Sequence, residues 1–382
     1  MARVRTYGGI TEALAEWRRL GVPEGTFGRS DLTSKRFIFL DDIVRNDALT
    51  LVQEVKVRGG QGCLCKGERA LIAITPVVLE AMLMGGATPE KVQEMTLAWK
   101  RRDQEEAPVF EWSGGSMDLS RPRIMGILNV TPDSFSDGGK HFDVEAAVAR
   151  AEQMRSEGAD LIDVGGESTR PGASVVPADE EWARISKVIA RVSEEVGLPV
   201  SVDTRRPEVA RKALRAGASL VNDVSGLGEE MTTVVRDAGA GAFIMHMRGE
   251  PANMQSDTQY VDVVGDTYAF LEKRVEQAVR KGVRWESLAV DPGLGFGKDL
   301  KGNLQIMRRL DEYRSLGRPV LLGASRKSFV ARVLDGESTD RLEGSLASAA
   351  VACWQGVRLF RVHDVKETVR TVKMVHSIME GR

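Results

Sequence analysis

The sequence of 382 residues is poor in cysteine and carries almost no excess charge. Its three cysteines are an odd number, and Cys63 and Cys65 lie too close to bridge easily, so reduced thiols are the simplest account. Lys and Arg number 53 against 55 Asp and Glu, a net charge of −2, which argues against nucleic acid or an anionic membrane as partner. The most apolar window, Ala70–Met84, is shorter than the roughly 20 residues that span a bilayer, and Met1–Leu20 does not resemble a signal peptide. We therefore expect a cytoplasmic protein.

Several catalytic patterns are also missing. There is no His-Glu-x-x-His sequence and no clustered His/Cys set, so a zinc centre is not expected, and two cysteines alone seldom hold a metal. There is no G-x-S-x-G elbow of a hydrolase. The glycines of Gly293–Gly297 lack the G-x-G-x-x-G spacing and the later acidic residue of a dinucleotide site.

Glycine, by contrast, is abundant, with 39 residues, and from Arg123 onward it falls within a repeating unit. Each unit has a short apolar run, a polar or Gly-rich stretch and an amphipathic helix. Continuous apolar runs are typical of parallel strands buried on both faces. About eight units in about 260 residues favour a (β/α)8 TIM barrel over an open doubly wound sheet, the main alternative. The expected strands are 123–130, 159–164, 199–203, 220–223, 242–245, 288–291, 319–323 and 359–362.

The first 118 residues differ from this pattern and predict a small α+β domain, which leaves 119–382 for the barrel. The stretch 103–120, with its Pro, Gly, Ser and acidic residues, resembles a linker. This domain has no catalytic signature. The expected strands are 36–40 and 69–74, and the expected helices are 10–20, 48–58, 77–84 and 89–102.

Polar residues follow the apolar runs of the predicted strands. A barrel enzyme has its active site at this place, at the carboxyl ends of the strands. Each alone could cap the next helix. Asn129, Arg361 and His363 end the first and last strands, which are neighbours in a closed barrel, and together suit an anion.

A second set of polar residues ends the other strands and predicts a different kind of ligand. Buried carboxylates cost several kcal/mol unless they are paired. A heterocycle with ring N–H and amino donors would satisfy them, with a lysine balancing charge. This set consists of Asp203, Asn222, Asp291 and Lys327.

Two longer stretches then resemble the signatures of dihydropteroate synthases: Ile124–Gly139 (IMGILNVTPDSFSDGG) and Gly158–Ala173 (GADLIDVGGESTRPGA). About eight motifs of this family occur in the right order, from Arg123 to the C-terminus. The others are Val202–Arg205, Val221–Gly226, Met245–Gly249 with Pro251 and Met254–Gln255, Asp291–Lys298, Gly323–Phe329 and Arg361–Val365.

The resemblance implies a transferase that joins p-aminobenzoate to 6-hydroxymethyl-7,8-dihydropterin pyrophosphate, with Mg²⁺, giving 7,8-dihydropteroate and pyrophosphate. It also implies a homodimer built through helices late in the chain. The resemblance further implies that Asn129 binds the metal, and that Asn129, Arg361 and His363 together bind pyrophosphate. The pterin would contact Asp203, Asn222, Met245, Asp291, Gly323 and Lys327. A loop with Ser168, Thr169, Arg170 and Pro171 would close over the site. The p-aminobenzoate would be bordered by Phe296, Lys327 and Ser328.

The expected mechanism follows from charge. Mg²⁺, Arg361 and His363 would neutralise the leaving pyrophosphate, and the Asp203 carboxylate would stabilise a developing cation on the pterin methylene, so no conventional acid/base pair is assigned. Two alternatives stay open: a methyltetrahydrofolate-dependent methyltransferase, and a pterin-binding protein without catalysis. The first needs no pyrophosphate site.

Overall fold

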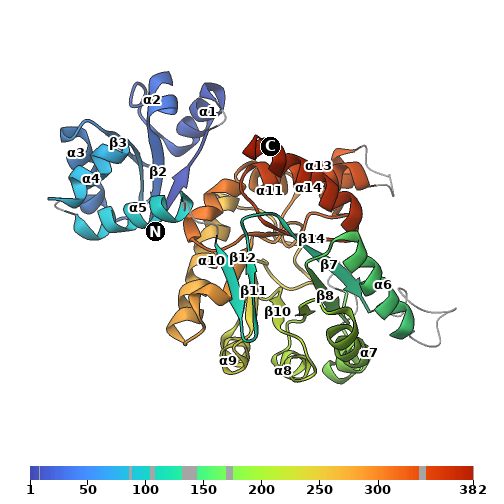
Figure 1. Cartoon of the computed structure of the whole chain (residues 1–382). Coiled ribbons are helices and arrows are strands. Elements are labelled where there is room, and N and C mark those ends of the chain that lie inside the picture. The colour runs from blue at the N-terminus through green and yellow to red at the C-terminus, as the bar shows by residue number, and fades with distance from the viewer. Residues whose placement is uncertain are drawn as a thin grey trace. The chain divides into compact units, whose positions relative to one another are not determined.

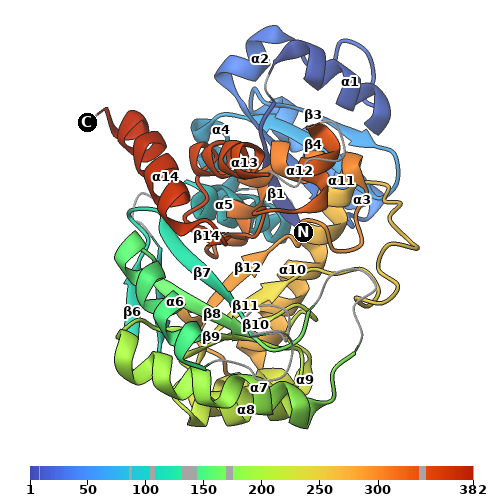
Figure 2. The ribbon, with the colours of Figure 1, turned by 90° about the vertical axis from the view of Figure 1, so that its right-hand side faces the viewer.

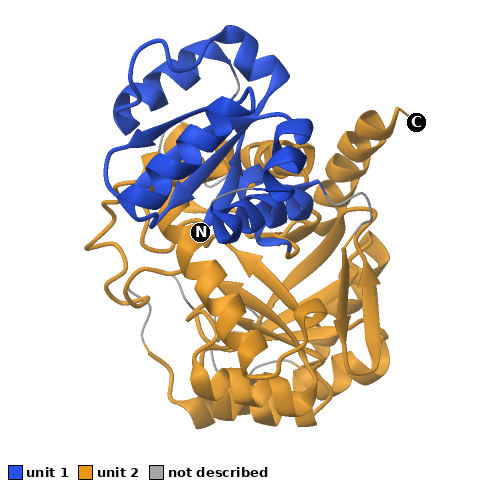
Figure 3. Cartoon of the chain, turned by 90° about the vertical axis from the view of Figure 1, so that its left-hand side faces the viewer, with its two compact units in different colours: residues 1–105, 311–317 blue, residues 106–310, 318–382 orange. Residues whose placement is uncertain are grey.

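The computed structural model describes residues 1–7, 9–85, 88–103, 108–130, 144–168, 175–334 and 341–381. Contacts divide the chain into two compact units (Figure 3). Unit 1 comprises residues 1–105 with 311–317, and unit 2 comprises residues 106–310 with 318–382. Within the described ranges, no helix is long and apolar enough to cross a membrane.

Unit 1 is built on an antiparallel four-stranded sheet in the order β1-β2-β4-β3, with helices packed against it (Figure 1). Apolar side chains on both faces of the sheet are buried. Along β2, Ile38 packs into one buried cluster with residues of α3, α4 and α5, while Phe37 packs into another with Trp17 of α1. This alternation confirms the expected α+β character, although β1, β3 and α2 had no predictive signal. The elements are β1 (Ala2–Arg5), α1 (Ile10–Leu20), α2 (Arg29–Ser34), β2 (Arg36–Asp41), α3 (Arg45–Val57), β3 (Gln61–Cys65), β4 (Arg69–Ile74), α4 (Pro76–Leu83) and α5 (Pro89–Arg102).

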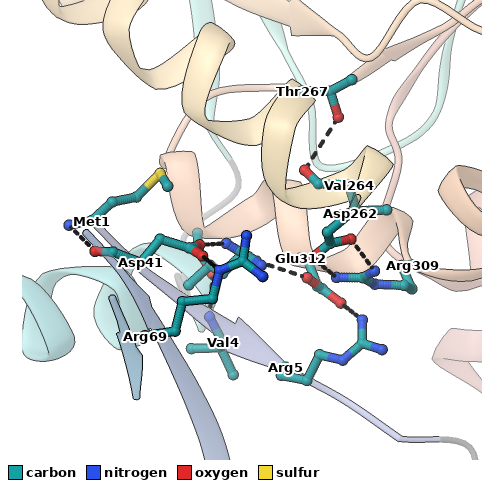
Figure 4. A network of polar contacts seen from close by, with 12 residues as sticks. Met1, Val4, Arg5, Asp41, Arg69, Asp262, Val264, Thr267, Arg309 and Glu312 are labelled. Carbon is teal, nitrogen blue, oxygen red and sulfur yellow. Dashed lines mark hydrogen bonds and ion pairs between the residues drawn. The ribbon is translucent and has the colours of Figure 1, made fainter. Parts of the chain in front are cut away.

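Segment 311–317 belongs to unit 1 because buried polar contacts tie it to β1 (Figure 4). Glu312 is fully buried and pairs with Arg5 and with Nε of Arg3 at 3.1 Å. The backbone N–H of Val4 donates to Oγ of Ser315 at 3.1 Å. A buried carboxylate is tolerated when cations and hydrogen bonds surround it. The first unit is therefore completed by residues that come late in the sequence.

Unit 2 contains the expected barrel of eight parallel strands, in the order β12-β11-β10-β9-β8-β7-β14-β13. A parallel bridge between Val290 and Val320, with the N–H of Val290 donating to the Pro319 carbonyl at 2.9 Å, joins the two ends of this sheet. This closure confirms the barrel and excludes the doubly wound sheet. The strands are β7 (Arg123–Asn129), β8 (Leu161–Gly165), β9 (Val200–Asp203), β10 (Leu220–Asp223), β11 (Gly241–Met245), β12 (Leu288–Asp291), β13 (Leu321–Leu322) and β14 (Leu359–Val362).

Helices alternate with the strands and cover the outside of the barrel, as for α6 against β7 and β8, and α7 against β8 (Figure 2). Their apolar faces pack inward, for example Ile185 and Val188 of α7, which are fully buried. The helices are α6 (Val144–Glu157), α7 (Ala178–Arg191), α8 (Pro207–Arg215), α9 (Glu229–Ala238), α10 (Val263–Arg280), α11 (Leu300–Arg308), α12 (Ser328–Val333), α13 (Leu342–Trp354) and α14 (Val365–Glu380).

A hairpin of β5 (Val109–Trp112) and β6 (Gly115–Asp118) occupies the stretch that the sequence suggested was a linker. Its Phe110 is fully buried in one cluster with residues near the amino ends of the barrel strands, and its ring centroid lies 5.1 Å from that of Phe243. The hairpin therefore packs at the barrel end opposite the polar rim. Contacts place the described residues 108–118 with the barrel, so the boundary between the two units lies before residue 108 and not at the expected residue 118.

Candidate active site

The strand register brings the first polar residues to one level of the rim. Asn129 pairs with Gly165 on the next strand, Gly165 with Asp203, and Asp203 with Asn222. Because these strands are parallel and end together, side chains far apart in sequence meet at one mouth.

Arg361 of β14 links two carboxylates inside this mouth. Its Nε donates to Oδ2 of Asp163 and its Nη2 to Oδ2 of Asp203, both at 2.6 Å. Nδ2 of Asn222 also donates to Oδ2 of Asp163, at 3.1 Å. The residues expected at the anion end and at the ring end are therefore joined through Arg361 and Asp163.

The electrostatics of this cluster follow from its burial. Burial raises the pKa of Asp203 to about 7, although the Arg361 charge opposes the shift. Burial alone would lower the pKa of Arg361, but Asp163 and Asp203 outweigh it and raise that pKa. Near neutral pH the guanidinium is charged and pairs with the Asp203 carboxyl, whose pKa burial holds above its usual range.

A second carboxylate and a lysine lie at the ends of neighbouring strands. Oδ1 of Asp291 accepts from the N–H of Gly293 at 2.6 Å, and burial raises the pKa of this carboxyl. Gly323 adjoins this carboxylate, since a Cβ built there would lie 3.9 Å from the other oxygen of Asp291. Burial and the Arg361 charge lower the pKa of Lys327 to about 8.

An apolar wall adjoins these charges. Met245, at the end of β11, packs with Val224, Met254 and Phe296 in one buried cluster. Nζ of Lys327 lies 4.1 Å from the ring centroid of Phe296, a cation–π contact. The wall offers flat apolar surface beside a half-buried cation.

Asn129 and His363 line a separate cavity of about 300 Å³ whose charged lining is mixed, with Arg150 and Arg326 beside the acidic residues Glu157, Asp364 and Glu367. Oγ of Ser325 lies 3.1 Å from Nδ1 of His363. Burial, followed by the charge of Arg361, lowers the pKa of His363 to about 4, so its imidazole is neutral at pH 7. His363 can therefore serve an anion as a hydrogen-bond donor, and its expected part in neutralising pyrophosphate stays a prediction.

The remaining predicted residues have varied positions. Ser168 follows β8, and Ser328 is the exposed first residue of α12. Thr169, Arg170 and Pro171 lie outside the described residues.

Asp223 also ends a strand, but its side chain stabilises the turn that follows β10. Its carboxylate accepts from the N–H groups of Ser225 at 2.7 Å and Leu227 at 2.9 Å.

Asp163 is the site residue that sequence reasoning missed. It lies within β8 rather than at its end, and it is fully buried. Its Oδ1 has no hydrogen-bond partner among the residues that the structure describes. A charged residue inside an apolar strand was the available signal, because such a residue is rarely buried without a partner.

Fold and site together define a (β/α)8 barrel enzyme whose mouth gathers buried carboxylates, an amide and two cations beside an apolar wall. The chain belongs to the family of pterin binding enzymes, whose family model matches residues 125–363. This confirms the family suggested by the sequence motifs.

Similar proteins agree. The chain is 42% identical over 270 residues to dihydropteroate synthase of Escherichia coli (strain K12), covering 70% of this chain and 96% of that protein. It is similar to the structure of Xanthomonas albilineans dihydropteroate synthase with 4-aminobenzoic acid (TM-score 0.67, 43% identity, 72% of this chain and 98% of that one). It is also similar to the enzyme of that organism in complex with 7,8-dihydropteroate (TM-score 0.65, 40% identity, 71% and 99%).

Proposed function

We propose that this protein is a dihydropteroate synthase, which condenses 6-hydroxymethyl-7,8-dihydropterin pyrophosphate with p-aminobenzoate. The relatives' names, and the 4-aminobenzoic acid and 7,8-dihydropteroate bound in similar structures, support the two substrates. The proposal then depends on whether the rim residues suit a pterin, an arylamine and a pyrophosphate.

The observation that carries the proposal is the hydrogen-bonded cluster of Asp163, Asp203, Asn222 and Arg361, of which Asp163 and Asn222 are buried. Oδ1 of Asp163 is a buried acceptor without a partner among the described residues. Leaving such an acceptor unpaired costs about 1–3 kcal/mol. A pterin presents ring N–H and amino donors to acceptors of this kind, and Asp291 adds a further carboxylate nearby.

The pyrophosphate would bind at the carboxyl ends of β7 and β14, which pair with each other and carry Asn129, Arg361 and His363. Arg361 would supply charge, and the neutral His363 would supply a hydrogen bond. Mg²⁺ fits this donor set, because it binds hard oxygen ligands, retains several waters and is commonly held by one or two protein groups plus substrate phosphates. The Asn129 amide oxygen would be its protein ligand, and the bound ion would neutralise phosphate charge.

In the proposed reaction the bond between the pterin methylene carbon and the pyrophosphate oxygen breaks, and both electrons leave with the oxygen. The Asp203 carboxylate faces the resulting cation in a site with little water, where a fixed negative charge is most effective. The amine nitrogen of p-aminobenzoate then forms the new C–N bond and releases a proton to solvent or pyrophosphate. Phe296 and Lys327 hold the arylamine in place, so positioning replaces a strong general base.

An assay of pyrophosphate release with and without p-aminobenzoate tests the proposal against its alternatives. A dihydropteroate synthase releases pyrophosphate only when p-aminobenzoate is present. A methyltransferase or a non-catalytic pterin-binding protein releases none under either condition.

We also propose a homodimer formed through the late helices. Val351 and Trp354 of α13, and Met374 and Ile378 of α14, are between 49% and 63% exposed, and the two helices pack against each other. Val351 and Trp354 are three residues apart and Met374 and Ile378 four, so each pair lies on one face of its helix, and exposed apolar groups of this kind are typical of an interface. Analytical ultracentrifugation should show a dimer that Trp354→Glu converts to a monomer; a wild-type monomer at micromolar concentration would contradict the proposal.

A further inference from the structure

Lys298 closes the motif Asp291–Lys298, but the proposed reaction gives it no role. It lies just before α11, after the loop that follows β12, and it is only 2% exposed. A lysine this deeply buried needs partners for its ammonium group.

Four acceptors surround this ammonium. Nζ of Lys298 donates to the carbonyls of Phe296 at 2.8 Å, Gly293 at 2.9 Å and His246 at 3.2 Å, and it lies 3.0 Å from Nδ1 of His246. Burial, reinforced by the Lys298 charge, lowers the pKa of His246 to about 2, so the imidazole is neutral and its Nδ1 can accept. Lys298 therefore joins the loop after β11 to the loop after β12.

The loop after β12 is composed largely of glycine and is shaped by its backbone contacts. Gly293 has φ +69°, and a Cβ there would lie 2.0 Å from the His246 carbonyl oxygen. Only glycine therefore allows the two loops to approach each other this closely. The Gly295 carbonyl accepts from Nε2 of Gln255 at 2.9 Å, and its N–H donates to Oδ1 of Asn303 at 2.7 Å. Because Gly-rich backbone has many alternative conformations, these contacts select one of them.

The conformation selected by Lys298 determines where Phe296 lies. The carbonyl of Phe296 is bound by Lys298, while its ring lies 4.1 Å from Nζ of Lys327. Asp291 has one side-chain contact with this loop, from the N–H of Gly293 at 2.6 Å, and it interacts electrostatically with Lys298. Its backbone, however, is held in β12 by the sheet, with the N–H of His246 donating to its carbonyl at 3.0 Å. Loss of Lys298 should therefore affect the Phe296 wall more than the Asp291 carboxylate.

We propose that Lys298 is a positioning residue that holds the glycine-rich loop against His246, so that Phe296 and Lys327 form the p-aminobenzoate wall. The link to p-aminobenzoate rests on the proposed function. The proposal that Lys298 fixes the loop is independent of that function. The loop and the binding of p-aminobenzoate are therefore tested by separate measurements.

The first measurement is hydrogen–deuterium exchange of Lys298→Met, which retains the length of the side chain but removes its donors. Lys301→Met, on the exposed first turn of α11, is the matched control. Lys298→Met should speed exchange at residues 293–297 while the amides of α10 stay protected. Unchanged exchange at 293–297 in a folded variant would overturn the proposal, whether or not the protein has the proposed activity.

The second measurement is steady-state kinetics. In Lys298→Met the KM for p-aminobenzoate should rise about tenfold, while the KM for the pterin pyrophosphate changes less than about threefold. A loss of turnover with both KM values unchanged would show a merely structural role and overturn the proposal. If Lys298→Met does not fold, Lys298→Gln decides by the same criteria, because it retains one N–H donor without a buried charge, and a smaller rise in the same KM is expected.

Discussion

Nη2 of Arg361 donates to Oδ2 of Asp203 at 2.6 Å, across the barrel mouth from the last strand to the third. The pair joins the group proposed to attract pyrophosphate to the group proposed to stabilise the pterin cation. When the leaving group binds, the guanidinium can divide its five donors between both partners, because its fork geometry allows several simultaneous contacts.

Asp203→Asn tests the cation-stabilising role. The amide keeps the shape and a hydrogen-bonding capacity, but it removes the negative charge, so we expect a folded protein whose kcat falls about 100-fold or more. Asp237→Asn, on the exposed face of α9, is the control and should not change kcat. Full turnover in folded Asp203→Asn would refute the role.

The pH profile of kcat/KM should be bell-shaped. The carboxylate of Asp203 is required and its pKa is about 7, so activity rises as pH increases toward 7. The ammonium of Lys327 is required and its pKa is about 8, so activity falls as pH increases beyond 8. The residual activity of Asp203→Asn should lack the lower limb. A lower limb centred near pH 4 in the wild type would contradict the raised pKa of Asp203.

Asn129→Ala should weaken the binding of pyrophosphate in the presence of Mg²⁺, because the cavity loses its amide oxygen. Isothermal titration calorimetry should show a loss of about tenfold, or 1.4 kcal/mol, and turnover should require more Mg²⁺. Asn46→Ala, at an exposed position in α3, is the control. Unaltered pyrophosphate affinity in Asn129→Ala would exclude this assignment.

Phe110→Ala should destabilise unit 2, because the hairpin fills the barrel end opposite the site. Removing a fully buried Phe side chain typically costs about 3–5 kcal/mol of unfolding free energy. Val109→Ala, which changes a neighbouring side chain that is 39% exposed, should cost much less. Denaturant unfolding compares the two variants, and equal stabilities would mean that the hairpin does not contribute to the barrel core.

The barrel was predictable from sequence because its strands are continuous apolar runs and its rim residues interrupt those runs at their ends. The hairpin of β5 and β6 was not predictable, because Phe110 and Trp112 lie in a short stretch whose Pro, Gly and Ser residues are typical of a linker. Their partners, such as Phe243, are far away in sequence. Nor does local sequence indicate that Glu312 pairs with Arg3 and Arg5.

In the candidate site, too, contacts between residues far apart in sequence could not be predicted. Asp203 and Asp291 were found because they end strands, whereas Asp163 lies inside one, and the Arg361 contact places it in the site. The neutral state of His363 also depends on burial and on the nearby Arg361 charge, which only the folded chain brings together.

The most direct test of the account follows both products over time, with purified protein, Mg²⁺, 6-hydroxymethyl-7,8-dihydropterin pyrophosphate and p-aminobenzoate. Mass spectrometry measures 7,8-dihydropteroate, and a coupled assay measures pyrophosphate. The account predicts that the two appear at equal rates and that neither accumulates when p-aminobenzoate is omitted. Failure to form 7,8-dihydropteroate, or pyrophosphate release that is independent of p-aminobenzoate, would contradict it.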